Sequence, residues 1–67
     1  MDIQTLECRL QEAGYRIETV ILGEDGRMRW NINGHFMFQE DAVDLVNGVA
    51  TVPEIVERNR GKIFPSR

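Results

Sequence analysis

The chain has 67 residues, with eight Lys or Arg, eleven Asp or Glu and a net charge of −3 at pH 7. This length allows one small domain, and a single cysteine excludes an internal disulfide. Cys8 and His35 are the only residues of their kinds, so they cannot supply the usual four-ligand zinc site.

The charge is unevenly distributed. Residues 1–57 contain all eleven acidic residues and four arginines, whereas residues 58–67 contain four basic residues and no acidic one. An acidic body argues against binding the phosphate backbone of nucleic acids. No run of about 18 apolar residues predicts a membrane helix, and no signal peptide is recognised at the start. These features predict a cytoplasmic protein with a reduced thiol.

The segment DIQTLECRLQEAG (residues 2–14) predicts a helix. Asp2 can cap its first turn, and Gly14 suits the left-handed position that ends helices. Cys8 is expected on the surface, outside the core. The apolar residues recur at helical spacing and predict one buried stripe, formed by Ile3, Leu6, Leu10 and Ala13.

The segment YRIETVIL (residues 15–22) is rich in β-branched residues and predicts a strand. Asp25-Gly26 then predicts a two-residue hairpin turn that places Ile21 opposite Trp30. RMRWN (residues 27–31) is the second strand. The face that carries Trp30 is expected to be buried; its other members are Tyr15, Ile17, Thr19, Ile21 and Met28.

The next turn decides which face of the third strand is buried, because a shift of one residue reverses every side chain. A two-residue Asn33-Gly34 turn would pair Trp30 with Met37. A three-residue loop over 32–34 would instead pair Trp30 with Phe36 and Met28 with Phe38. We favour the three-residue loop, because it gathers the tryptophan and both phenylalanines on the buried face.

QEDAVDLVNG (residues 39–48) predicts a second helix. Ala42, Leu45 and Val46 form its buried stripe. Acidic residues in its first turn suit the helix dipole, and Glu40, Asp41 and Asp44 are expected on a solvated face.

TVPEIVER (residues 51–58) predicts a short third helix with a Thr51–Glu54 capping box and Pro53 in its first turn. Val52, Ile55 and Val56 should face inward. Glu54 and Arg58 should form an i,i+4 ion pair.

Together these elements predict an α+β fold of order α-β-β-β-α-α, a three-stranded antiparallel meander with helices packed on one face. The domain spans 1–58, and 59–67 is expected to be a basic, flexible C-terminal tail. No nucleophile–base pair, phosphate-binding loop or metal-ligand cluster is recognisable. The sequence therefore predicts a protein that is not an enzyme and has no cofactor or metal.

The face of the sheet left uncovered by helices is the predicted binding surface. Apolar, Arg and Met side chains there would meet a protein partner. Its predicted partner-binding residues are Arg16, Val20, Leu22, Arg27, Arg29, Asn31, His35 and Met37.

These residues suggest two kinds of partner. We expect a small accessory, adaptor or inhibitor protein, of bacterial or phage type, that binds another protein or a second copy of itself. Association is expected because so short a chain buries only a small core. The alternative is a nucleic-acid-binding module that uses Arg27, Arg29 and the basic tail. No membrane partner is expected.

The order helix, meander, helix also resembles that of double-stranded-RNA-binding domains, over roughly residues 3–47. Those domains grip phosphates with lysines at the start of their last helix. This chain has Gln39-Glu40-Asp41 at that place, which has the wrong charge, so RNA binding is not expected from the resemblance.

Overall fold

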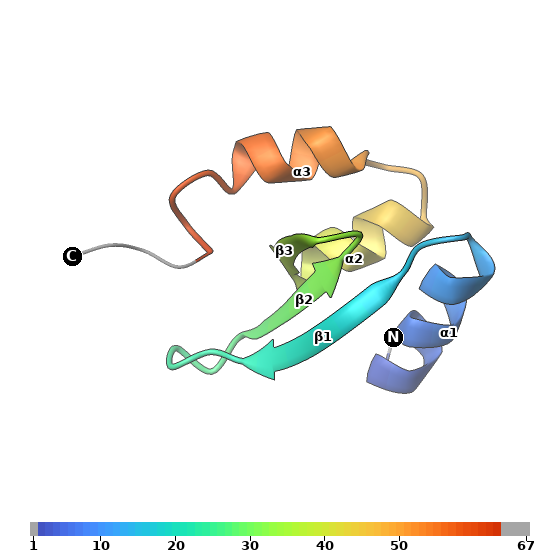
Figure 1. Ribbon diagram of the computed structural model, residues 1–67, viewed down its shortest axis with the longest axis horizontal. Helices are drawn as coiled ribbons and strands as arrows, with labels where there is room; N and C mark the ends of the chain where they lie inside the picture. The colour runs from blue at the N-terminus through green and yellow to red at the C-terminus, as the bar shows by residue number, and fades with distance from the viewer. Residues whose placement is uncertain (1, 64–67) are drawn as a thin grey trace.

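The computed structural model describes residues 2–63 and confirms the predicted order of elements (Figure 1). The strands β1 (Ile17–Leu22), β2 (Met28–Ile32) and β3 (His35–Phe38) form one antiparallel sheet in the order β1-β2-β3. The helices are α1 (Ile3–Glu12), α2 (Gln39–Val46) and α3 (Val52–Arg58). No helix in the described part of the chain has the length and apolarity to cross a membrane.

The helix ends follow the predicted capping signals. Asp2 Oδ1 accepts a hydrogen bond from Thr5 N at 2.7 Å, so the first turn of α1 is capped as expected. Gly14 follows α1 with a φ of 93°, a conformation that glycine adopts at little cost. The buried stripe of α1 is narrower than predicted, because Leu6 and Leu10 are buried but Ile3 and Ala13 are exposed.

The first hairpin has a longer loop than predicted. Gly23 N donates to Arg27 O at 2.9 Å, which leaves residues 24–26 as a three-residue loop. Gly26 takes a left-handed φ of 81°, as this loop type requires. Val20 therefore lies opposite Trp30, and the predicted pairing of Ile21 with Trp30 is wrong.

The second hairpin has a shorter turn than predicted. Asn33 and Gly34 have φ values of 53° and 85°, the two left-handed positions of a tight hairpin turn. Trp30 consequently lies opposite Met37. The favoured three-residue loop is wrong: Met37 is buried in the core, and Phe36 and Phe38 lie on the opposite face.

A β-bulge corrects a further prediction for β1. Its register against β2 shifts between Ile17 and Thr19, so Ile17 and Val20 both lie on the core side of the sheet. Both are partly buried and pack against the core. Thr19 and Ile21, which were expected to be buried, are exposed on the other face.

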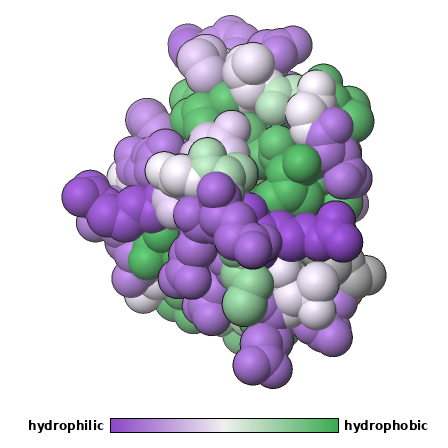
Figure 2. Space-filling model, turned by 90° about the vertical axis from the view of Figure 1, so that its right-hand side faces the viewer, coloured by the Kyte–Doolittle hydropathy of each residue, from purple (hydrophilic) through white to green (hydrophobic). Residues whose placement is uncertain are grey.

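The core lies between α1, α2 and one face of the sheet, with α3 packed beside β3 (Figure 1). Viewed from the right-hand side of Figure 1, apolar surface is broken into patches by polar side chains (Figure 2). The core residues come from all three helices, from β2 and β3, and from the loop between α2 and α3: Leu6, Leu10, Trp30, Ile32, Met37, Ala42, Leu45, Ala50 and Ile55.

Residues 59–63, the first part of the predicted tail, continue from α3 and contact the body. Asn59 is buried, and Lys62 N donates to Asn59 O at 2.8 Å. The carbonyl oxygen of Ile63 accepts hydrogen bonds from Arg29. Residues 64–67, the rest of that tail, lie outside the described residues.

Candidate functional site

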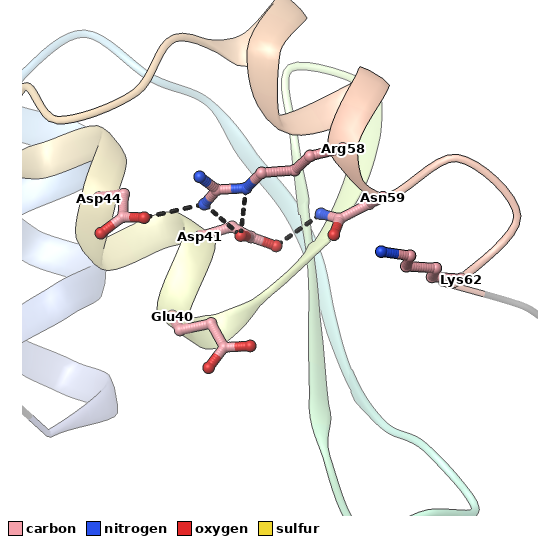
Figure 3. A pocket seen from close by; sticks show the side chains of 6 residues that line it. All are labelled: Glu40, Asp41, Asp44, Arg58, Asn59 and Lys62. Atoms are coloured by element: carbon pink, nitrogen blue, oxygen red, sulfur yellow. Dashed lines mark hydrogen bonds and ion pairs between the residues drawn. The ribbon is translucent and has the colours of Figure 1, made fainter.

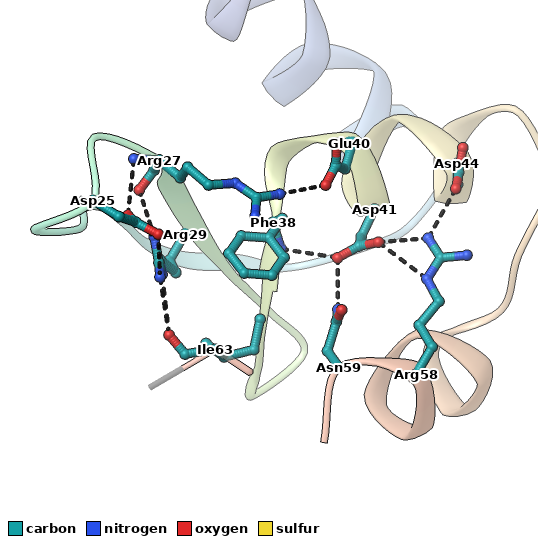
Figure 4. Close-up of polar contacts among 10 residues, drawn as sticks. All are labelled: Asp25, Arg27, Arg29, Phe38, Glu40, Asp41, Asp44, Arg58, Asn59 and Ile63. Carbon is teal, nitrogen blue, oxygen red and sulfur yellow. Dashed lines mark hydrogen bonds and ion pairs between the residues drawn. The ribbon is translucent and has the colours of Figure 1, made fainter. Parts of the chain in front are cut away.

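A buried carboxylate joins α2 to α3 (Figures 3 and 4). Asp41 is only 3% exposed, so the expectation of a solvated side chain is wrong. One of its oxygens accepts from Phe38 N at 3.0 Å and from Asn59 Nδ2 at 2.6 Å. The other accepts from the guanidinium of Arg58, which also binds Asp44 at 2.8 Å. Hydrogen bonds from Arg58 to Asp44 and Asp41 raise the pKa of Arg58 above its usual value.

An open groove of about 420 Å³ surrounds this contact (Figure 3). Most of its polar groups already have partners within the chain: Arg58 and Asn59 bind Asp41, and Glu40 binds Arg27, which lies outside the groove. Residues 2–63 contain no group of three or more His, Cys, Asp or Glu placed to hold a metal ion. We therefore assign these contacts to stability: they hold α3 against α2. The residues that line the groove are Glu40, Asp41, Asp44, Arg58, Asn59 and Lys62.

A second polar cluster surrounds Phe38 (Figure 4). The guanidinium carbons of Arg27 and Arg29 lie 3.8 and 4.8 Å from the centre of its ring, which is the distance range of cation–π contacts. Arg27 also binds Glu40 at the start of α2. Phe38 is buried as expected, but on the opposite face of the sheet, where the two arginines cover it.

Arg29 is held in place by several partners. It is 5% exposed, and it donates to Asp25 Oδ1 at 2.6 Å and to the Ile63 carbonyl at 3.1–3.2 Å. Hydrogen bonds from the Arg29 side chain and, to a smaller extent, from Arg27 N lower the pKa of Asp25 to about 2. Gly23 leaves room for the guanidinium, because a Cβ there would lie 2.4 Å from Arg29 Nη1.

The structure divides the predicted partner-binding residues into two groups. Met37 and Arg29 are buried and Val20 is half-buried against the core, so the expectation that these three are exposed is wrong. The two-residue turn places Met37 on the core side, and the bulge does the same for Val20. Arg29 is buried because its guanidinium binds Asp25. The remaining members are exposed or half-buried: Arg16, Leu22, Arg27, Asn31 and His35.

The outer edge of β1 is the candidate binding surface. In the described part of the chain, β1 pairs only with β2, whereas the edge strand β3 has α3 beside it (Figure 1). Gly23 N donates to the carbonyl oxygen of Arg27, the residue just before β2. The alternation of an antiparallel ladder then turns Thr19 and Ile21 toward β2, and turns the backbone groups of Val20 and Leu22 outward.

Exposed apolar side chains lie on the same stretch of β1. Leu22 is 68% exposed and Ile21 is 38% exposed. Ile21 shares its face of the sheet with Arg29 and Phe38, and Leu22 lies opposite Met28 on the other face. Apolar side chains thus flank the outward backbone groups on both faces of the edge.

No protein-family model matches this chain, and no curated protein or solved structure shows significant similarity to it.

Proposed function

We propose that this protein is a small, non-enzymatic protein-binding module that acts through the outer edge of β1. The observation that supports this most directly is the combination of outward backbone groups at Val20 and Leu22 with the exposed side chains of Ile21 and Leu22. An open strand edge is a template for an added strand. Main-chain hydrogen bonds then supply affinity, and alternate side chains supply specificity.

Protection of the edge is uneven along β1. Proteins usually blunt an exposed edge with bulges, charges or proline. Here the bulge and Glu18 lie at the start of the strand. The rest of the strand, Thr19–Leu22, has no charged residue and no proline. This unprotected part is the one we assign to binding.

The cytoplasm is the compartment we propose for this activity. Cys8 is exposed and unpaired, and a lone surface thiol stays reduced in the cytoplasm.

Nucleic-acid binding has less support. Binding to the phosphate backbone needs cations that are free to meet it. Arg29 is buried against Asp25 and Ile63, and Arg27 contacts Glu40 and Phe38. The arginine ribbon of that alternative is therefore already occupied by contacts within the chain.

Two matched lysine substitutions test the proposal. Leu22 and Val49 are 68% and 69% exposed, but only Leu22 lies on β1. Each tagged variant and the wild type would be used to capture partners from cells that contain this protein, with identification by mass spectrometry. We expect the wild type and Val49→Lys to retain a specific protein, either a different protein or a second copy of this chain. Leu22→Lys should lose it. Equal capture by all three proteins would contradict the proposal, and so would capture of nothing.

A further inference from the structure

We infer that the segment that binds the outer edge of β1 is β1 of a second copy, paired antiparallel about a two-fold axis at Ile21. This inference rests on the proposed function and specifies its partner. It joins the two three-stranded sheets into one continuous sheet of six strands. It follows from the backbone, the side chains and the charges of β1.

The backbone of the free edge is self-complementary. Beyond the bulge, Thr19–Leu22 pair regularly with β2 and Gly23 N bonds to Arg27 O, so this stretch is centred on Ile21. Val20 and Leu22 lie on either side of that centre, and both direct their N–H and C=O groups outward. A two-fold axis at Ile21 therefore places Val20 of each copy opposite Leu22 of the other. All the outward groups of this stretch would then be hydrogen-bonded.

The side chains fit the same register. Ile21 of one copy would face Ile21 of the other as a non-hydrogen-bonded pair, the kind in which side chains approach most closely. On the opposite face, the exposed Leu22 would pack against Val20 of the second copy. Two apolar residues that the monomer leaves exposed, Ile21 and Leu22, would thus both become covered.

The charges at the ends of the paired strands also suit a second copy. At the ends of the paired stretch, where the bulge and the loop begin, Glu24 of one copy would lie near Glu18 and Arg16 of the other. Arg16 is exposed, and its Nη2 lies 3.7 Å from Glu18 Oε2. Glu24 has no ion pair among residues 2–63. Arg16 would therefore lie between two carboxylates, which offsets their mutual repulsion.

The register can be tested by disulfide cross-linking. Cys8 is first replaced with Ser, so that no native thiol competes. Ile21→Cys is then compared with Ile3→Cys, because the two isoleucines are similarly exposed, at 38% and 45%. Under mild oxidation we expect Ile21→Cys to form a covalent dimer at least about 10-fold faster, since pairing holds the two thiols at a high effective concentration. Circular dichroism checks that both variants are folded.

Native mass spectrometry, without any cross-linking, provides the second measurement. We expect a dimer for the wild type and Val49→Lys, and a monomer for Leu22→Lys. A wild-type monomer, or cross-linking of Ile21→Cys no faster than that of Ile3→Cys, would overturn the inference. If that monomer still captured a different protein in a Leu22-dependent manner, the proposed function would stand without the second copy. A monomer that captured nothing would overturn both.

Discussion

Asp41 and Arg58 are 17 positions apart in the chain, yet their side chains join the first turn of α2 to the last turn of α3. Asp41 also accepts from Phe38 N and Asn59 Nδ2. One buried carboxylate therefore satisfies donors from three residues, which belong to the end of β3 and the end of α3. Because α3 packs beside β3, this contact also helps to keep that edge of the sheet covered while β1 stays open.

Replacing Asp41 should destabilise the fold. Asp41→Asn removes the negative charge that Arg58 binds and leaves donors without their preferred acceptor. We expect the free energy of unfolding, measured with urea, to fall by about 2 kcal/mol. Glu57→Gln is the control, because Glu57 and Arg60 form an exposed pair whose loss should cost less than about 0.5 kcal/mol. Equal effects of the two substitutions would refute a stabilising role for Asp41.

The Asp25–Arg29 contact should appear in the acid stability of the protein. The pKa of Asp25 falls from 3.8 to about 2 in the folded state. A lowered folded-state pKa stabilises the protein above the unfolded value, and this contribution is lost as the pH falls from 3.8 toward 2. Over that range the melting temperature of the wild type should fall more steeply than that of Asp25→Asn. Glu24→Gln, next in the same loop, should behave like the wild type. Parallel curves for all three proteins would show that the contact does not form in solution.

The register of the second hairpin can be tested on two residues of β3, Met37 and His35. Met37 is buried, whereas His35 is exposed on the same strand. Met37→Ala should lower the free energy of unfolding by about 3 kcal/mol. His35→Ala should change it by no more than about 0.5 kcal/mol. If Met37→Ala lowers the free energy of unfolding no more than His35→Ala does, the two-residue turn is wrong. The three-residue loop, which buries Phe36, would then be the correct register.

Gly23 should be sensitive to substitution because of Arg29. A methyl group at Gly23 would overlap the guanidinium, so Gly23→Ala should destabilise the wild type by about 1–3 kcal/mol. In an Arg29→Met background the guanidinium is gone, and the same substitution should cost much less. A double-mutant cycle from urea unfolding measures this difference. An unchanged cost in both backgrounds would mean that Gly23 is needed for another reason.

The features that were predicted correctly are those determined by short stretches of sequence. Asp2, Gly14 and the Thr51–Glu54 capping box act within one or two turns of a helix. Together with the strand and turn signals, they were enough to predict the order α-β-β-β-α-α. The predicted pairing of Glu54 with Arg58 is replaced by bonds from Arg58 to Asp41 and Asp44.

The hairpin registers could not be predicted, because both loops contain a residue pair that suits more than one loop length. Asp25-Gly26 is part of a three-residue loop and Asn33-Gly34 forms a two-residue turn, which reverses our assignment. Hydrophobicity favoured packing Phe38, and not Met37, on the face that the helices cover; both are buried, but Met37 is the one in the main core. Hydrophobicity could not anticipate that two arginines would cover Phe38. The open edge of β1 depends on these registers, so the sequence alone pointed to a face of the sheet rather than to its edge.

Amide hydrogen exchange at β1 tests the central claim most directly. In the isolated chain, the N–H groups of Thr19 and Ile21 bond to β2, whereas those of Val20 and Leu22 point outward. We expect the amides of Val20 and Leu22 to become protected as the protein concentration rises, and this gain to disappear in Leu22→Lys. Thr19 and Ile21 should be protected throughout, as internal controls. Free exchange of Val20 and Leu22 at every concentration, with Thr19 and Ile21 protected, would contradict pairing of the edge with a second copy.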